Sequence, residues 1–217
     1  ARSSDEQRVG EHLDERGPHI AAIYREIYLE MGRSLAMPGS AQDFDRALEL
    51  YDKGLERCAL PKGFAKPEKP ELPEEADEET KAKAEESYQE LLDERNGLVD
   101  KSRDDKLRFR LETGKVRALQ GDVTAALKTF QEILEVDSRH KDARLEMGRV
   151  HDLAGDYPKA IACFSDVIEQ DSKTLRAYLL RGQTLYELGR HEDALQDFTK
   201  VLDLKDDSFE GYIWLGR

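Results

Sequence analysis

Histidine and cysteine, the side chains that most often bind transition metals or act as nucleophiles, are scattered along this sequence. The five histidines and two cysteines show no spacing typical of a metal site: His12, His19, His140, His151, His191, Cys58 and Cys163. Neither a glycine-rich phosphate loop nor a nucleophile motif occurs. Carboxylate pairs are numerous, but with 47 Asp and Glu in 217 residues such pairs are expected by chance. The sequence therefore predicts no enzyme, no metal site and no cofactor.

The charge balance argues against two further classes of function. The chain has 34 Lys and Arg against 47 Asp and Glu, a net charge of −13, whereas binders of nucleic acid or anionic membranes need a basic surface. Residues 71–94 hold eleven acidic and two basic residues, so most of the excess lies in one segment. No run approaches the roughly 18 apolar residues of a membrane span, and no basic start followed by an apolar run marks a signal peptide. We expect a soluble protein, with the cytoplasm favoured, that binds neither nucleic acid nor a membrane.

A repeat of 34 residues organises the second half of the chain. The segments that begin at Leu111, Leu145 and Leu179 place the same residue types at the same positions. Four series recur at this step: Gly114, Gly148 and Gly182; Gly121, Gly155 and Gly189; Ala126, Ala160 and Ala194; Phe130, Phe164 and Phe198. A fixed period with this many matches predicts a solenoid of stacked units.

Each unit reads as two helices. Apolar residues at spacings of three and four from Leu107 to Leu119 predict the first helix of the first unit. The second glycine of each unit is expected to end that helix, because glycine tolerates a positive φ. Asp122 and Asp156 are predicted N-caps of the second helices, and Pro158 fits a first helical turn.

This pattern resembles the tetratricopeptide repeat, a helix–turn–helix of 34 residues. The first-helix glycine, the second-helix alanine and the phenylalanine four residues later match the family over residues 107–217. The sequence departs from the family where Arg110 and Arg144 replace an aromatic residue and where Ser138 and Ser172 replace a proline. The resemblance implies an all-α, right-handed superhelical solenoid that binds other proteins.

Three regions are expected along the chain. Residues 1–58 would carry N-terminal helices, including one at 4–16, and one diverged unit marked by Gly32, Ala47 and Tyr51. Residues 59–106 would form a proline-rich loop at 59–73 followed by an acidic helical segment. Residues 107–217 would hold three units and the start of a fourth. The acidic segment is either an insertion within the array or part of a long helix that runs into the unit at 107.

By the family resemblance, the first helices line the concave side of the array. We count the units from Arg25, Leu107, Lys141, Leu175 and Phe209; positions five and nine then share one helix face. Position five holds Leu29, Leu111, Leu145, Leu179 and Ile213, and position nine holds Arg33, Lys115, Arg149, Gln183 and Arg217. An apolar row beside a mostly basic row predicts a groove for an acidic, partly apolar segment of a partner protein. The alternative is that the leucines pack between helices and the basic residues are ordinary solvated surface.

The sequence thus predicts a protein–protein interaction module, an adaptor or scaffold without catalysis of its own. One family subtype clamps chaperone tails with Lys and Asn at positions five and nine, and this sequence lacks that pattern. Two alternatives stay open: a self-assembling scaffold, or the adaptor region of a larger enzyme or co-chaperone. Residues 209–217 start a unit with four apolar residues in a row, Tyr212 to Leu215, so we expect the natural chain to continue or another molecule to cover this end. Cys163, Arg117 and His151 are expected to have packing roles.

Overall fold

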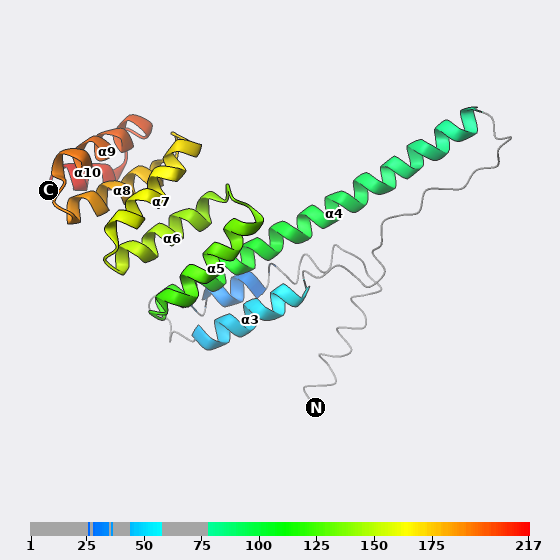
Figure 1. Ribbon diagram of the computed structural model, residues 1–217, viewed down its shortest axis with the longest axis horizontal. Helices are drawn as coiled ribbons and strands as arrows, with labels where there is room; N and C mark the ends of the chain where they lie inside the picture. The colour runs from blue at the N-terminus through cyan, green and yellow to red at the C-terminus, as the bar shows by residue number, and fades with distance from the viewer. Residues whose placement is uncertain (1–25, 27, 35, 37–43, 58–77) are drawn as a thin grey trace. The chain divides into compact units, whose positions relative to one another are not determined.

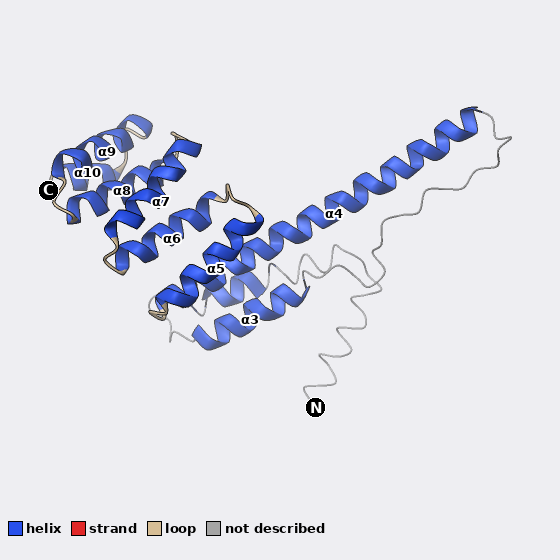
Figure 2. Cartoon of the chain, in the orientation of Figure 1, coloured by secondary structure: helices blue, strands red, loops and turns tan. Residues whose placement is uncertain are grey.

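The computed structural model describes residues 26, 28–34, 36, 44–57 and 78–217 (Figure 1). The helix expected at 4–16 and the loop expected at 59–73 lie outside these residues. Every element of the described part is a helix, and no strand occurs in it (Figure 2), which confirms the all-α class. The chain forms two compact parts, which we call the N-terminal half (residues 1–109) and the C-terminal half (residues 110–217).

The N-terminal half is built on close packing of aromatic rings against glycines. It contains the helical residues 28–34, α3 (Phe44–Arg57) and the first part of α4 (Glu78–Leu119). A Cβ atom at Gly32 would collide with the Tyr51 ring, and one at Gly54 with the Phe109 ring. The two rings meet edge to face, with centroids 6.3 Å apart. The contact of Gly32 with Tyr51 is similar to the glycine–phenylalanine contacts within residues 110–217, and the diverged repeat unit stays a prediction.

Helix α4 is a single helix of 42 residues. Ala, Glu, Lys, Gln and Leu dominate its first half, and these residues are strong helix formers even where little apolar surface is buried. The helix runs without a break through residues 106 and 107, where the sequence predicts a domain boundary. Acidic residues 78–94 therefore lie in a helix that continues into the unit at 107, the second of the two alternatives. The described residues contain no separately folded insertion, and the three region boundaries stay predictions.

The C-terminal half consists of helix pairs. The end of α4 pairs with α5 (Val123–Val136), α6 (Lys141–Leu153) with α7 (Tyr157–Gln170), and α8 (Leu175–Glu187) with α9 (His191–Leu204); α10 (Phe209–Leu215) packs on α9 and α8. In each pair a phenylalanine of the second helix lies against a glycine of the first: Phe130 on Gly114, Phe164 on Gly148 and Phe198 on Gly182. These rings are almost fully buried. The 34-residue period is therefore the period of the core.

The turns between paired helices follow the predicted chemistry with one exception. Gly121, Gly155 and Gly189 have φ of 83°, 76° and 79°, which confirms their role in ending the first helices. Asp122 caps α5, because its carboxylate accepts a hydrogen bond from the Ala125 N–H at 2.9 Å. Asp156 sits at the N-cap of α7 without the capping hydrogen bond seen for Asp122, and its carboxylate pairs with the Lys159 ammonium at 2.6 Å. Pro158 lies in the first turn of α7, as predicted.

Candidate functional site

The leucines at position five contribute mainly to the interior. Leu29, Leu111 and Leu145 are 0%, 8% and 2% exposed. Leu145 belongs to a cluster with Ala160, Phe164, Val167 and Ala177, and the half-buried Leu179 packs against the cluster of Leu185, Ala194 and Phe198. A side chain with so little exposed surface has little to offer a partner. The position-five residues in these units therefore form an interior row between helices.

The position-nine residues divide into two groups. Lys115 and Arg149 line one common hollow in the C-terminal half. The others lie elsewhere in the described structure. Arg33 in the N-terminal half pairs with Glu30 at 2.8 Å. Arg217 lies over the Trp214 ring at 4.5 Å. Gln183 is half-buried on α8. Ile213, the position-five residue of the last, incomplete unit, is exposed on α10.

The hollow has a volume of about 290 Å³ and is lined by residues from the end of α4, from α6 and from the start of α8. All three are first helices of successive units, so the hollow lies on the face that the resemblance predicts for binding. We call it the α4–α6–α8 groove; its lining residues are Lys115, Ala118, Leu119, Glu146, Arg149, Val150, Leu153 and Arg176.

The floor of the groove carries a buried carboxylate held by two guanidinium groups. Glu146 is only 4% exposed. Arg149, one turn later on α6, donates from Nη1 to Oε2 at 2.8 Å, and Arg176, from the next unit, donates from Nη2 to Oε1 at 2.6 Å. Both arginine side chains keep 46% of their surface exposed. Because each guanidinium has five N–H donors, both present further donors to the groove.

A second ion pair lies one unit earlier. Lys115 donates to Glu112 at 3.1 Å, and the Glu112 side chain is largely buried. The three cations Lys115, Arg149 and Arg176 thus face two carboxylates, which leaves one positive charge in excess. An incoming acidic group meets a surface that is both positively charged and rich in N–H donors.

Exposed apolar surface lies beside these charges. Leu119 at the end of α4 is 55% exposed, and Leu153 at the end of α6 is 75% exposed. Both line the groove, and both occupy position thirteen of their units, two residues before the turn glycines. The apolar side of the groove therefore comes from position thirteen, and the expectation that position five supplies it does not match the burial of these leucines.

Six lining residues are absent from the set that the sequence predicts; beside Ala118 and Val150 they are Leu119, Glu146, Leu153 and Arg176, which carry the charges and the exposed apolar surface. A signal exists for three of them. Arg176 occupies position two, on the same helix face as positions five and nine. Leu119 and Leu153 recur at the 34-residue step before an exposed turn. Glu146 also recurs, as Glu112 one unit earlier, but this recurrence does not indicate its burial, which depends on an arginine 30 residues further along the chain.

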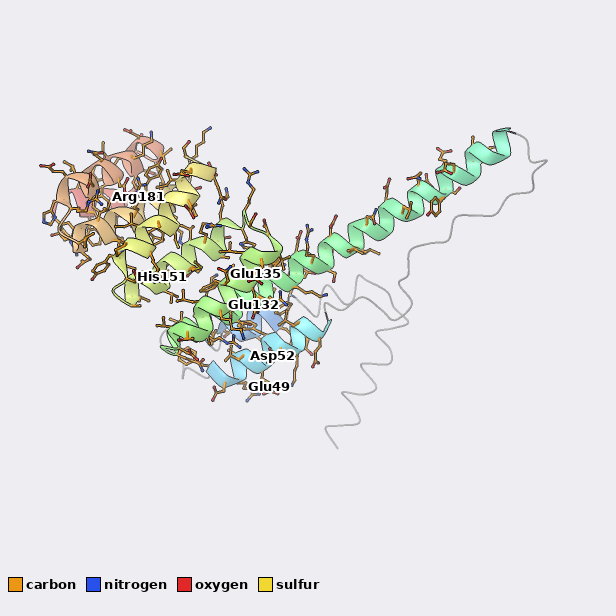
Figure 3. The ribbon with its side chains drawn as sticks, viewed as in Figure 1. Glu49, Asp52, Glu132, Glu135, His151 and Arg181 are labelled. Atoms are coloured by element: carbon orange, nitrogen blue, oxygen red, sulfur yellow. The ribbon has the colours of Figure 1, made fainter. Side chains whose placement is uncertain are left out.

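Two further arginines, Arg181 (labelled in Figure 3) and Arg117, make polar contacts between packed helices. Arg181 makes a two-pronged contact with Asp197, at 2.8 and 2.7 Å, and also donates to Ser165 at 3.0 Å. The hydrogen bonds to Asp197 raise the pKa of Arg181 above its already high value. Arg117 donates to Thr129 at 2.6 Å, in agreement with the packing role expected for it.

His151 and Cys163 are partly removed from water. Burial lowers the pKa of His151, while Asp156 and Lys159 have smaller effects that oppose each other, so its imidazole is mainly neutral at pH 7. Burial raises the pKa of the Cys163 thiol, and this residue is buried as expected for a small core side chain. Within the described residues, no group of His, Cys, Asp and Glu is arranged to hold a metal ion. The same residues include no helix with the length and apolarity needed to cross a membrane.

Comparison with known proteins bears on the fold. Residues 145–209 match the family model of the tetratricopeptide repeat. No curated protein matches the chain. A solved structure of the MamA RS-1 ArsTM double mutant has a TM-score of 0.53 and 15% identity, covering 89% of this chain and 82% of that chain.

Two further structures are similar over about half of this chain. The Arabidopsis OM64 TPR domain has a TM-score of 0.49 and 18% identity, covering 53% of this chain and 95% of its own. The first TPR of Spaghetti bound to an HSP90 peptide has a TM-score of 0.48 and 20% identity, covering 51% and 88%. At 15% identity the likeness to the MamA mutant concerns the fold alone. The family model matches residues 145–209, and the 34-residue period and the glycine–phenylalanine core show the same repeat architecture in the neighbouring helix pairs.

Proposed function

We propose that this protein is an adaptor that binds an acidic, partly apolar segment of a partner protein in the α4–α6–α8 groove. The tetratricopeptide fold supports a protein–protein interaction module in general. The observation that carries the finer proposal is the juxtaposition of three cations with two exposed leucines around one hollow.

The charges favour an acidic segment. The groove has one positive charge in excess, and Arg149 and Arg176 are held in place by Glu146 with donors still available. A guanidinium that is already oriented loses less conformational freedom when it binds a carboxylate. Positive charge also steers an acidic partner during the encounter and raises the association rate at low salt.

The leucines favour a segment that also carries an apolar side chain. Leu153 exposes three quarters of its surface and Leu119 more than half. Covering such surface contributes roughly 25 cal/mol per Å² of apolar area removed from water. An acidic side chain next to an apolar one would therefore use both parts of the groove.

Peptide selection tests this proposal. A random peptide library displayed on phage is selected against the purified protein, and we expect enriched sequences that combine Asp or Glu with Leu, Ile or Phe. The double variant Lys115→Gln with Arg176→Gln removes two groove cations but leaves Glu146 paired with Arg149. It should lose this enrichment.

The matched control removes two positive charges elsewhere in the C-terminal half. It carries Lys128→Gln and Lys173→Gln, and both lysines are exposed and outside the groove. It should select the same peptides as the unmodified protein. Enrichment of neutral or basic peptides, or equal enrichment by the double groove variant, would contradict the proposal.

Self-association is the second candidate, favoured by exposed apolar residues on α10. Phe209, Tyr212 and Ile213 are 73%, 59% and 41% exposed, while Trp214 and Leu215 pack inward against the cluster around Phe198. Light scattering over a range of protein concentrations tests it. A constant monomer mass would exclude assembly through α10, and a concentration-dependent dimer that Ile213→Ser abolishes would support it.

A further inference from the structure

Two successive units repeat the same acid–cation pair. Position six holds Glu112 and Glu146, and position nine, one turn later, holds Lys115 and Arg149. Each glutamate is buried and pairs with its own cation, at 3.1 and 2.8 Å. The third unit has Leu180 and Gln183 at these positions and carries no such pair. The cations that face the groove are thus partly neutralised by carboxylates of the protein itself.

Glu146 is the more firmly held of the two. Its side chain is 6% exposed and accepts hydrogen bonds from arginines of two different units. A buried carboxylate without its partners would be strongly destabilised, so Glu146 stays bound to Arg149 and Arg176. Any acidic group that enters the groove must share these two guanidinium groups with a fixed negative charge.

We propose that Glu146 is a specificity-determining residue of the groove. Its carboxylate competes with the acidic group of the bound segment for Arg149 and Arg176, so that acidic charge alone is not enough for binding. The groove then accepts a segment whose acidic side chain lies beside an apolar one and rejects segments that are acidic only. This inference rests on the proposed function, because it concerns the ligand chemistry of the same site.

The physical basis is a balance between charge and burial. With three cations against two carboxylates, a ligand carboxylate gains from a single excess positive charge, and solvent screens that gain further. The remaining affinity must come from apolar contact with Leu119 and Leu153. The fixed charge of Glu146 weakens every acidic ligand alike, so that only a ligand with added apolar contact binds well, and such a repulsive element is a general route to specificity.

Three fluorescein-labelled nonapeptides with glycine–serine ends serve as probes. The first has the centre Glu-Leu-Glu-Leu-Glu, the second replaces its leucines with serine, and the third replaces its glutamates with glutamine. Dissociation constants are measured by fluorescence anisotropy for the unmodified protein and for Glu146→Gln. The matched control is Glu135→Gln, which removes the same charge from an exposed site on α5 outside the groove (Figure 3).

For the unmodified protein we expect the first peptide to bind at least about tenfold more tightly than the other two. Glu146→Gln should strengthen binding of both acidic peptides by about tenfold, so that the Glu–Ser peptide binds this variant about as tightly as the Glu–Leu peptide binds the unmodified protein. Glu135→Gln should leave both dissociation constants unchanged. Unchanged or weaker binding of the acidic peptides by Glu146→Gln would overturn the inference while leaving the proposed function intact.

Failure of the proposed function looks different. If neither the unmodified protein nor Glu146→Gln binds any of the three peptides, both proposals fall. Thermal unfolding followed by circular dichroism checks that each variant is folded. If Glu146→Gln is not, Glu146→Leu replaces it, since the next unit carries Leu180 at this position. The expected gain in affinity for the acidic peptides is the same.

Discussion

The units at 141–174 and 175–208 share one packing scheme but place their charges differently. In both, a phenylalanine of the second helix fills the space left by a glycine of the first: Phe164 on Gly148, and Phe198 on Gly182. The first of these units directs Glu146 and Arg149 to the groove, where the second has Leu180 and Gln183. The unit at 175–208 instead places the pair Arg181–Asp197 inside, where the unit at 141–174 has Met147 and Cys163.

The difference shows that the repeat determines packing and leaves charge free to vary. Positions in contact with a neighbouring helix tolerate few residue types, because a core is packed without room for larger side chains. Positions at the groove, or at one internal site, accept either an ion pair or a pair of uncharged side chains. Function in this chain is therefore expected at the positions where the units differ.

The largest effect tests the shared packing. Phe164→Ala should lower the free energy of unfolding by about 3–5 kcal/mol, because it opens a cavity against Gly148, and Phe198→Ala should do the same in the next unit. Urea denaturation measures both. Leu153→Ala, at an exposed groove position, serves as the control and should change stability by less than about 0.5 kcal/mol. A cost of Phe164→Ala as small as that of Leu153→Ala would remove the packing half of the comparison.

The next effect tests the internal ion pair. Asp197 is 4% exposed, and Asp197→Ala should cost about 3 kcal/mol, because it leaves the Arg181 guanidinium without its partner. Arg181→Met combined with Asp197→Cys installs the residues of the preceding unit, Met147 and Cys163. This exchange should cost less than about 1.5 kcal/mol. If denaturation finds the double variant as unstable as Asp197→Ala, the two units are not interchangeable at these positions.

A smaller effect distinguishes two reasons for a glycine, a positive φ of the backbone and a lack of space for a side chain. Gly155 has φ of 76°, and Gly97 lies within helix α4; at either position an added Cβ would meet no other atom within 4 Å. Gly155→Ala should destabilise the protein by about 1 kcal/mol, since alanine disfavours positive φ. Gly97→Ala should stabilise it by about 0.5–1 kcal/mol through helix propensity. Thermal melts with the same sign for both variants would contradict this assignment of the turn.

The smallest effect concerns the ion pair Lys141–Asp171, which the next unit lacks because Leu175 and Lys205 stand there. The hydrogen bond from Lys141 lowers the pKa of Asp171, assisted by the Lys173 N–H. A lowered pKa stabilises the fold at pH above the ordinary value for Asp, and this contribution disappears as the pH falls through the lowered value. Lys141→Gln should raise the pKa of Asp171 in an NMR titration. An unchanged midpoint would show that the pair does not persist in solution.

Much of the fold could be predicted because the relevant signals are local or periodic. Gly155 marks a turn by its own conformational freedom, and Phe164 marks the core by its 34-residue recurrence. The acidic stretch before 107 is ambiguous in sequence, since a helix rich in Glu, Lys and Ala reads the same whether it stands alone or continues into the next element.

The site was only partly predictable. The shared helix face identifies Lys115 and Arg149, but it also points to Leu145, which is buried. Periodicity shows which residues share a face, and it does not show which part of that face a neighbouring helix covers. The sequence does not reveal the contact of Glu146 with Arg176, because that contact joins two units and its geometry exists only once the helices are stacked.

The central claim is that an acidic, apolar segment binds in the α4–α6–α8 groove. NMR of the isotope-labelled protein, titrated with the Glu-Leu-Glu-Leu-Glu nonapeptide, tests this directly. We predict shift changes confined to the end of α4, to α6 and to the start of α8, including Lys115, Leu119, Arg149, Leu153 and Arg176. Changes centred instead on the separate hollow lined by Arg139, Arg144 and Glu169, or no changes at all, would contradict the claim.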